Sequence, residues 1–122
     1  MEKLLVFGVT DIEYSKIKQI ASRMKLRCEH FSSSCYSCTL EQLLSLNEAN
    51  VAAASTAMHS ESLLVMCDLS DKRVDKLLFE LRRSDVALDY KAILTPTNRK
   101  WTVSQLLLEM RREKAAYQRM QP

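Results

Sequence analysis

The sequence contains very little glycine or proline, with one and two residues respectively among 122. Tight hairpins depend on these residues, so their scarcity excludes a β-sandwich and favours helices with capped ends. A single glycine also excludes the glycine-rich loops that bind nucleotides. No apolar run approaches the roughly 20 residues of a membrane span, and the segment after Met1 is too short for a secretion signal. We therefore expect a cytoplasmic protein whose four cysteines are thiols.

The sequence also lacks a large excess of either positive or negative charge. The net charge is +3, from 18 basic and 15 acidic residues that alternate along the chain. Without a basic stripe or stacking aromatic residues, the sequence gives no reason to expect a nucleic-acid partner. Apolar residues make up 47% and charged residues 27%, which is typical of a globular protein. We expect a single domain over residues 1–122.

The chain contains an internal repeat, covering residues 3–31 and 62–95. Leu4 to Gly8 aligns with Leu63 to Cys67, and after one inserted residue, Asp68, the following turns also align. The apolar spacing predicts strands at 3–9, 26–31, 62–67 and 90–95, and helices at 11–24, 39–46, 71–84 and 103–118. Residues 47–60 fit a continued helix and a loop equally well.

Right-handed crossovers within each half predict an α/β fold. Two βαβ-like halves would form a four-stranded, mostly parallel sheet of order 2-1-3-4 with flanking helices. The carboxyl ends of its first and third strands would then meet in a crevice suited to a ligand. This crevice would be lined by Gly8, Thr10, Cys67 and Asp68.

Side chains that cap helices mark where the helices begin. Three threonines stand three residues before a Glu or Gln, the spacing of a reciprocal capping box. A fourth start has Ser70 with no such partner. The boxes are Thr10 with Glu13, Thr39 with Gln42, and Thr102 with Gln105.

No set of residues indicates catalysis or a cofactor. Asp68 occupies a position like the phosphorylated aspartate of response regulators, but Gly8-Val9 stands where their magnesium-binding acidic pair would be. Acidic residues crowd the helix starts beside the predicted crevice and would repel an anion. We expect a protein without catalytic residues.

A metal or thiol site is the main alternative. Cys28, His30, Cys35 and Cys38 supply four zinc-ligand types within a short stretch, and the Cys35/Cys38 pair precedes a helix. Their spacing matches no standard zinc module. The simpler interpretation is that Cys28 packs as a small apolar residue and His30 lies at the rim of the core.

Residues 95–102 read Thr-Pro-Thr-Asn, two variable residues, then Trp-Thr. With the preceding strands, this motif resembles a bacterial domain family of unknown function over residues 62–118. The resemblance implies a bacterial cytoplasmic protein and supplies no activity or site residues.

The motif itself has two interpretations. As a connector, Pro96 ends a strand and a buried Trp101 packs on the next helix, so Trp101→Ala would destabilise the protein far more than Asn98→Ala. As a binding site, four polar residues would meet a small-molecule ligand at the edge of the sheet. These are Thr95, Thr97, Asn98 and Arg99.

The last helix is apolar over more than one stripe, through Leu106, Leu107, Leu108 and Met110. We therefore expect self-association through this helix. The sequence as a whole favours a non-catalytic regulatory or protein-interaction module of otherwise unknown function.

Overall fold

The computed structural model describes residues 2–31, 33–44 and 61–120. The undecided segment 47–60 lies outside these residues. In chain order the elements are β1 (Lys3–Phe7), α1 (Asp11–Arg23), β2 (Arg27–Phe31), the 3-10 helix η1 (Ser33–Ser37) and α2 (Leu40–Leu44), followed by β3 (Leu63–Cys67), α3 (Asp71–Arg83), β4 (Tyr90–Ile93), the 3-10 turn η3 (Asn98–Lys100) and α4 (Val103–Met120).

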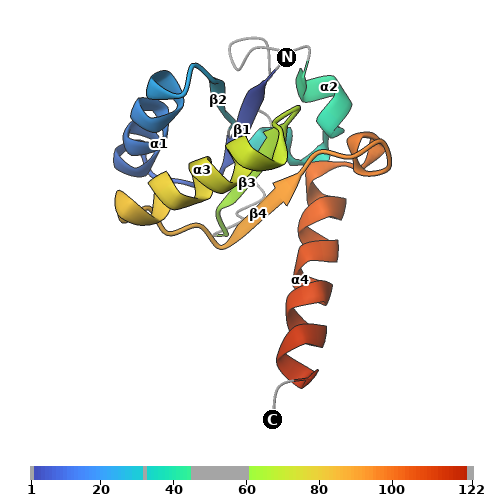
Figure 1. Cartoon of the computed structure of the whole chain (residues 1–122). Helices are drawn as coiled ribbons and strands as arrows, with labels where there is room; N and C mark the ends of the chain where they lie inside the picture. The colour runs from blue at the N-terminus through green and yellow to red at the C-terminus, as the bar shows by residue number, and fades with distance from the viewer. Residues whose placement is uncertain (1, 32, 45–60, 121–122) are drawn as a thin grey trace.

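A four-stranded sheet of order β2-β1-β3-β4 forms the centre of the protein, which confirms the predicted α/β fold and strand order (Figure 1). β1 and β2 are parallel, as are β3 and β4. The central pair, β1 and β3, is antiparallel and aligns Lys3 with Cys67 and Phe7 with Leu63. The sheet is thus mostly parallel, with one antiparallel junction between two βαβ halves.

The two halves are related by a pseudo-twofold axis through the sheet. The central register pairs Leu5 with Val65, which occupy the same position in the two halves. An alignment of the halves on this register pairs Phe7 with Cys67 and Gly8 with Asp68, without the inserted residue of the predicted repeat.

The same symmetry extends to the second helix of each half. Thr39 and Thr102, which precede α2 and α4, face each other across an isolated antiparallel bridge. The amide of Leu40 donates to the carbonyl of Trp101 at 3.0 Å, and the amide of Val103 donates to that of Cys38 at 3.1 Å. The duplicated unit is therefore β-α-β-α, longer than the segment 3–31 and its copy at 62–95.

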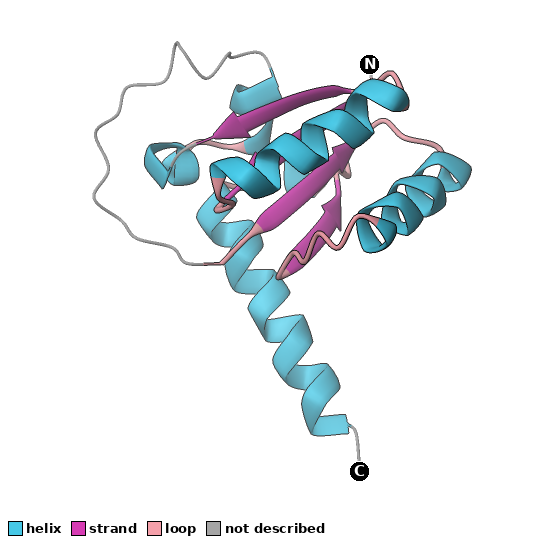
Figure 2. Cartoon of the chain, turned by 90° about the vertical axis from the view of Figure 1, so that its left-hand side faces the viewer, coloured by secondary structure: helices cyan, strands magenta, loops and turns pink. Residues whose placement is uncertain are grey.

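Helices cover both faces of the sheet and enclose two apolar cores (Figure 2). α1 and α3 lie side by side on one face, over Leu4, Val6, Leu64 and Met66. η1, α2 and the first turns of α4 pack on the other face, over Leu5, Phe7, Leu63 and Val65. Among the described residues, no helix has the length and apolar character needed to cross a membrane.

All three predicted capping boxes form. The side chain of Thr10 accepts from the amide of Glu13 at 3.2 Å, and Glu13 accepts from the amide of Thr10 in return. Equivalent pairs open α2 and α4. Ser70 caps α3 through the amide of Arg73 alone, as expected. These local bonds fix where the helices begin and so position the connecting turns.

Candidate functional site

The turn after β4 is held together by Asn98. Its side-chain oxygen accepts from the amide of Thr95 at 2.8 Å, and its side-chain nitrogen donates to the carbonyl of Ile93 at 3.0 Å. The amide of Asn98 in turn donates to the hydroxyl of Thr95 at 3.0 Å. Asn98 is only 8% exposed, so its polar groups serve the turn and are turned away from solvent.

The neighbouring candidates do not converge on one point. Thr97 is exposed, and Arg99 lies 3.5 Å from the carboxylate of Glu41 on α2. Thr95 and Asn98 are thus joined to each other, whereas Arg99 links η3 to α2. Ligand binding by these residues stays a prediction, and the contacts describe a connector that fastens β4 to α2 and α4.

Trp101 differs from the prediction that it is buried. It is only partly buried, at the start of α4, whereas Asn98 is buried. Asn98→Ala should therefore destabilise the protein more than the sequence predicts, because truncation would break the hydrogen bonds of this buried side chain. Because Trp101 is only partly buried, its truncation to alanine should cost less stability than truncation of a tryptophan in the core.

The predicted crevice at Gly8, Thr10, Cys67 and Asp68 does not exist as one site. Because β1 and β3 are antiparallel, their carboxyl ends lie at opposite ends of the sheet. Gly8 and Thr10 are therefore at one end, and Cys67 and Asp68 are at the other. The predicted crevice assumed that β1 and β3 run in the same direction.

Asp68 has a backbone role that explains its position. Its φ is +62° and that of its counterpart Gly8 is +70°. Both residues turn the chain from a strand into a capped helix, in the left-handed region where Gly is favoured and Asp is tolerated better than most residues. Only Gly fits at Gly8, since a Cβ there would collide with the carbonyl of Glu61.

The four residues of the metal and thiol hypothesis lie on opposite faces of the sheet. Cys28 packs with the core under α1, and the ring of His30 stacks on that of Tyr14 at 4.6 Å. Cys35 and Cys38 belong to the core on the other face. Throughout the described part of the chain, no three His, Cys, Asp or Glu side chains are grouped so as to hold a metal ion.

Burial also makes two of the thiols unreactive. Desolvation raises the pKa of Cys28 to about 11, and desolvation with the charge of Asp68 raises the pKa of Cys67 to about 12. Thiolates are the reactive species in redox chemistry, and a raised pKa suppresses them. All four cysteines are free thiols.

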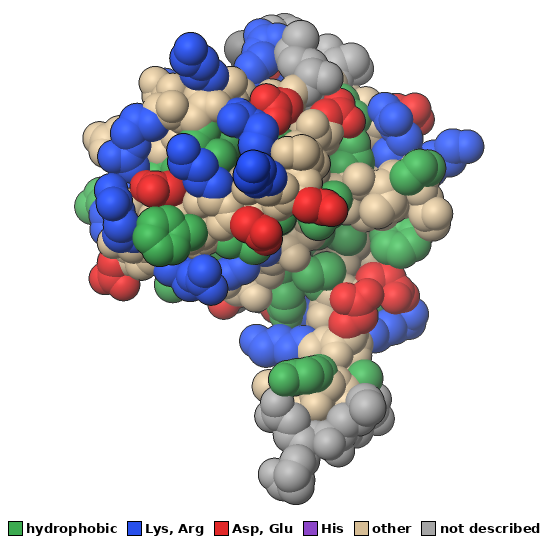
Figure 3. Space-filling view, viewed as in Figure 1, with side chains coloured by type: hydrophobic (Ala, Val, Ile, Leu, Met, Phe, Trp, Pro, Cys, Tyr) green, Lys and Arg blue, Asp and Glu red, His purple; other side chains and the backbone are tan. Residues whose placement is uncertain are grey.

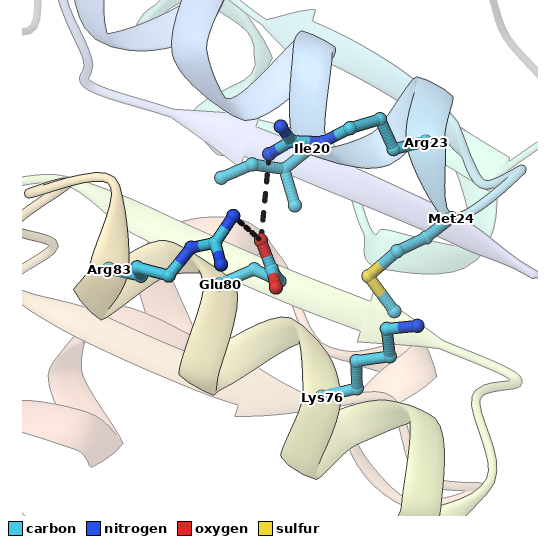
Figure 4. A pocket seen from close by; sticks show the side chains of 6 residues that line it. All are labelled: Ile20, Arg23, Met24, Lys76, Glu80 and Arg83. Atoms are coloured by element: carbon cyan, nitrogen blue, oxygen red, sulfur yellow. Dashed lines mark ion pairs between the residues drawn. The ribbon is translucent and has the colours of Figure 1, made fainter.

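A shallow pocket of about 170 Å³ lies between α1 and α3 (Figure 4). Arg23 and Arg83, which are symmetry equivalents, both approach the carboxylate of Glu80, at 3.6 and 3.8 Å. Ile20 and Met24 supply the apolar wall. Glu80 offsets only one of the two arginines, and Lys76 also lines the pocket, so this seam between the two helices keeps a net positive charge.

The outer part of α4 presents an open surface. Leu106 and Leu107 are buried on the sheet, whereas Leu108 is 45% exposed. Beyond Arg111 the helix leaves the body, and every side chain from Arg112 to Gln118 is exposed (Figure 1). Figure 3 shows charged side chains of both signs and several hydrophobic ones where the helix departs.

An ion-pair clamp, formed by Glu61, Tyr90 and Arg111, holds α4 where the helix leaves the body of the protein. Nε of Arg111 donates to a carboxylate oxygen of Glu61 at 2.6 Å, and the hydroxyl of Tyr90 donates to the other oxygen at 2.6 Å. The ammonium of Lys114 lies 5.6 Å from the centre of the Tyr90 ring. Sequence reasoning missed this clamp, because Glu61 and Arg111 are far apart in the chain and neither belongs to a motif.

A second polar pair is buried in the sheet itself. Lys3 is 7% exposed, lies 3.0 Å from the carboxylate of Glu29, and donates to the carbonyl of Leu44 at 3.1 Å. The sequence predicts Lys3 only as the first residue of a strand.

Comparison with known proteins finds a match for the second half of the chain. We find no significant match among curated proteins or among solved structures. Residues 62–117, which begin just before β3 and end within α4, match a domain of unknown function, DUF3783.

Proposed function

We propose that this chain is a non-catalytic interaction module of the bacterial cytoplasm that associates with a second copy of itself through α4. The observation that carries this proposal is the outer part of the helix, from Arg112 to Gln118, whose side chains are all exposed. Helices without tertiary contacts are marginal in water, because packing supplies most of their stability. A partner against this helix would supply the missing contacts.

A second copy fits the pattern of exposed residues on α4. The side chains that face away from the body recur at alternate spacings of four and three residues, as in the seam of a coiled coil. They are Gln105, Leu108, Arg112 and Ala115, and the partly buried Trp101, which packs against the core just before α4, lies one step earlier in the same series. Trp101, Gln105, Leu108 and Arg112 also line a shallow groove of about 290 Å³, which a side chain of a neighbouring helix could enter.

The charges of this stripe are compatible with an antiparallel pair. In the antiparallel register of the stripe that is centred between Leu108 and Arg112, Leu108 of one copy faces Arg112 of the other. Glu109, whose carboxylate lies 2.9 Å from Arg112 of its own helix, then lies within one turn of Arg112 of the second copy. The long stem of Arg112 would cover Leu108 while its charged end remains near both glutamates.

The size of the exposed surface on α4 determines how strong the self-association should be. A helix of 18 residues is about 27 Å long, and a pair of such helices buries less than the roughly 800 Å² per partner of a standard interface. The seam has only one large aliphatic side chain, Leu108. We therefore expect reversible association at micromolar concentrations and above, which suits a regulatory contact better than an obligate dimer.

Light scattering over a concentration series tests the proposal. The wild-type mass should rise from that of a monomer toward that of a dimer, and Leu108→Lys should hold the protein as a monomer. Phe79→Lys is the matched control, since Phe79 is 53% exposed on α3 and lies outside the seam. A wild-type protein that stays monomeric at high micromolar concentration, or equal effects of the two substitutions, would contradict the proposal.

A further inference from the structure

The edge of the sheet at β4 is open. The amides of Tyr90 and Leu94 donate to β3, to the carbonyls of Ser62 at 3.0 Å and Met66 at 2.9 Å. In a parallel ladder the intervening residues, Lys91 and Ile93, direct their backbone groups away from that neighbour. Among the described residues no strand pairs with this outer edge.

Asn98 covers one end of the edge. Its side-chain nitrogen donates to the carbonyl of Ile93, the last outward-facing acceptor of β4. The amide and carbonyl of Lys91 and the amide of Ile93 remain directed outward. Three backbone groups in alternating order are what an added strand would bond.

A groove of about 350 Å³ runs between this edge and α4. Lys91 and Ile93 form its strand wall, and Leu106, Glu109, Met110 and Glu113 form its helix wall. Ile93 is 49% exposed, so the strand wall offers apolar surface.

The groove continues along the helix. Leu106, Met110 and Glu113 recur at spacings of four and three residues, and the next position in that series is Tyr117, which is 65% exposed. The helix wall thus presents apolar side chains at its base, two carboxylates along its length and an aromatic ring at its far end.

We propose that this groove binds an extended segment of a partner protein, which adds to β4 as a fifth strand and directs a basic side chain toward Glu109 and Glu113. Alternate side chains of an added strand point to the same face, so those on the α4 side would contact Met110 and the two carboxylates. The backbone bonds would supply affinity, and the alternating side chains would supply specificity.

Charge favours a foreign peptide over a second copy at this edge. If two copies joined through β4, each would bring its own Glu109 and Glu113 to the same side of the extended sheet, where like charges repel. A peptide with a basic side chain on the α4 side meets Glu113, and Glu109 beside its ion pair with Arg112, without this repulsion. Lys91 lines the strand wall, so basic side chains are favoured only toward α4. This groove shares Trp101 and Glu109 with the groove beside Leu108, but Leu108 and Arg112 do not line it, so the site goes beyond the proposed self-association.

A random peptide library displayed on phage, selected against the whole chain, tests the proposal. Selected peptides should alternate apolar and basic residues and contain no proline at the centre. In NMR titrations with a synthetic copy of a selected peptide, the amides of Lys91 and Ile93 should shift most. Glu113→Lys should weaken binding about tenfold or more, equivalent to about 1.4 kcal/mol.

Two control variants separate this proposal from the previous one. Asp75→Lys makes the same charge change on α3 and should leave binding unchanged, as should Leu108→Lys. Selection of no binding peptide would overturn the proposal. Peptides without basic residues, or shifts centred on α1 and α3 or on Leu108, would overturn it as well.

Discussion

Replacing Asn98 with alanine should destabilise the protein although the residue lies in a surface turn. The side chain makes two hydrogen bonds, with the amide of Thr95 and the carbonyl of Ile93, and is 8% exposed. Each bond contributes about 0.5–1.5 kcal/mol, so we expect a loss of about 1–3 kcal/mol in the free energy of unfolding. The amide of Thr95 and the carbonyl of Ile93 would both lose a partner.

Urea denaturation followed by far-UV circular dichroism measures this loss. Thr97→Ala is the control, because Thr97 is exposed one residue away and its truncation should stay within about 0.5 kcal/mol of wild type. An unchanged slope with a lower midpoint would show that the native state alone is affected. If Asn98→Ala were as stable as Thr97→Ala, the connector role of Asn98 would be refuted.

Three further predictions concern Gly8, Lys3 and Cys28. Gly8→Ala should cost more than about 1 kcal/mol by urea denaturation, because Ala disfavours φ of +70° and its Cβ would meet the carbonyl of Glu61; equal stability would contradict this strain. Lys3→Met should cost about 1–3 kcal/mol by leaving the partly buried Glu29 without its cation, whereas adding Glu29→Leu should restore most of the stability; additive losses in the double variant would disprove the coupling. The thiol of Cys28, with its pKa raised to about 11, should resist alkylation at pH 8 in folded protein and react as the pH approaches 11 or when urea is added; rapid labelling at pH 8 would contradict its burial.

Much of the fold could be predicted because its signals are local. The capping boxes at Thr10, Thr39 and Thr102 depend on residues three positions apart, and each one forms. Strand order also followed, since crossovers within each half place β2 and β4 at the two edges.

The direction of β3 relative to β1 could not be predicted in the same way. Both strands are buried on both faces, so their side chains show no alternation that would fix register or direction. The chain between β2 and β3 is long enough for either direction. The crevice at Gly8 and Asp68 was therefore placed wrongly, and the ungapped repeat became visible only from the pairing of Leu5 with Val65.

The surface of α4 was predicted in part. Leu108 was assigned to the partner surface together with Leu106 and Leu107, but the latter two cover the sheet. Helical spacing separates these residues only when the direction of the core is known. The open edge of β4 beside Glu109 and Glu113 depends on contacts between distant segments, so no short motif indicates it.

Hydrogen exchange of the outer turns of α4 tests the central claim most directly. The backbone amides from Arg112 to Gln118 belong to a helix whose side chains are exposed in the single chain. If this part of α4 meets a second copy, protection of these amides should increase with protein concentration and should not do so in Leu108→Lys. Amides of β1 serve as the internal reference, because they lie at the centre of the sheet. Fast exchange from Arg112 to Gln118 at every concentration, or equal protection in the variant, would contradict association through α4.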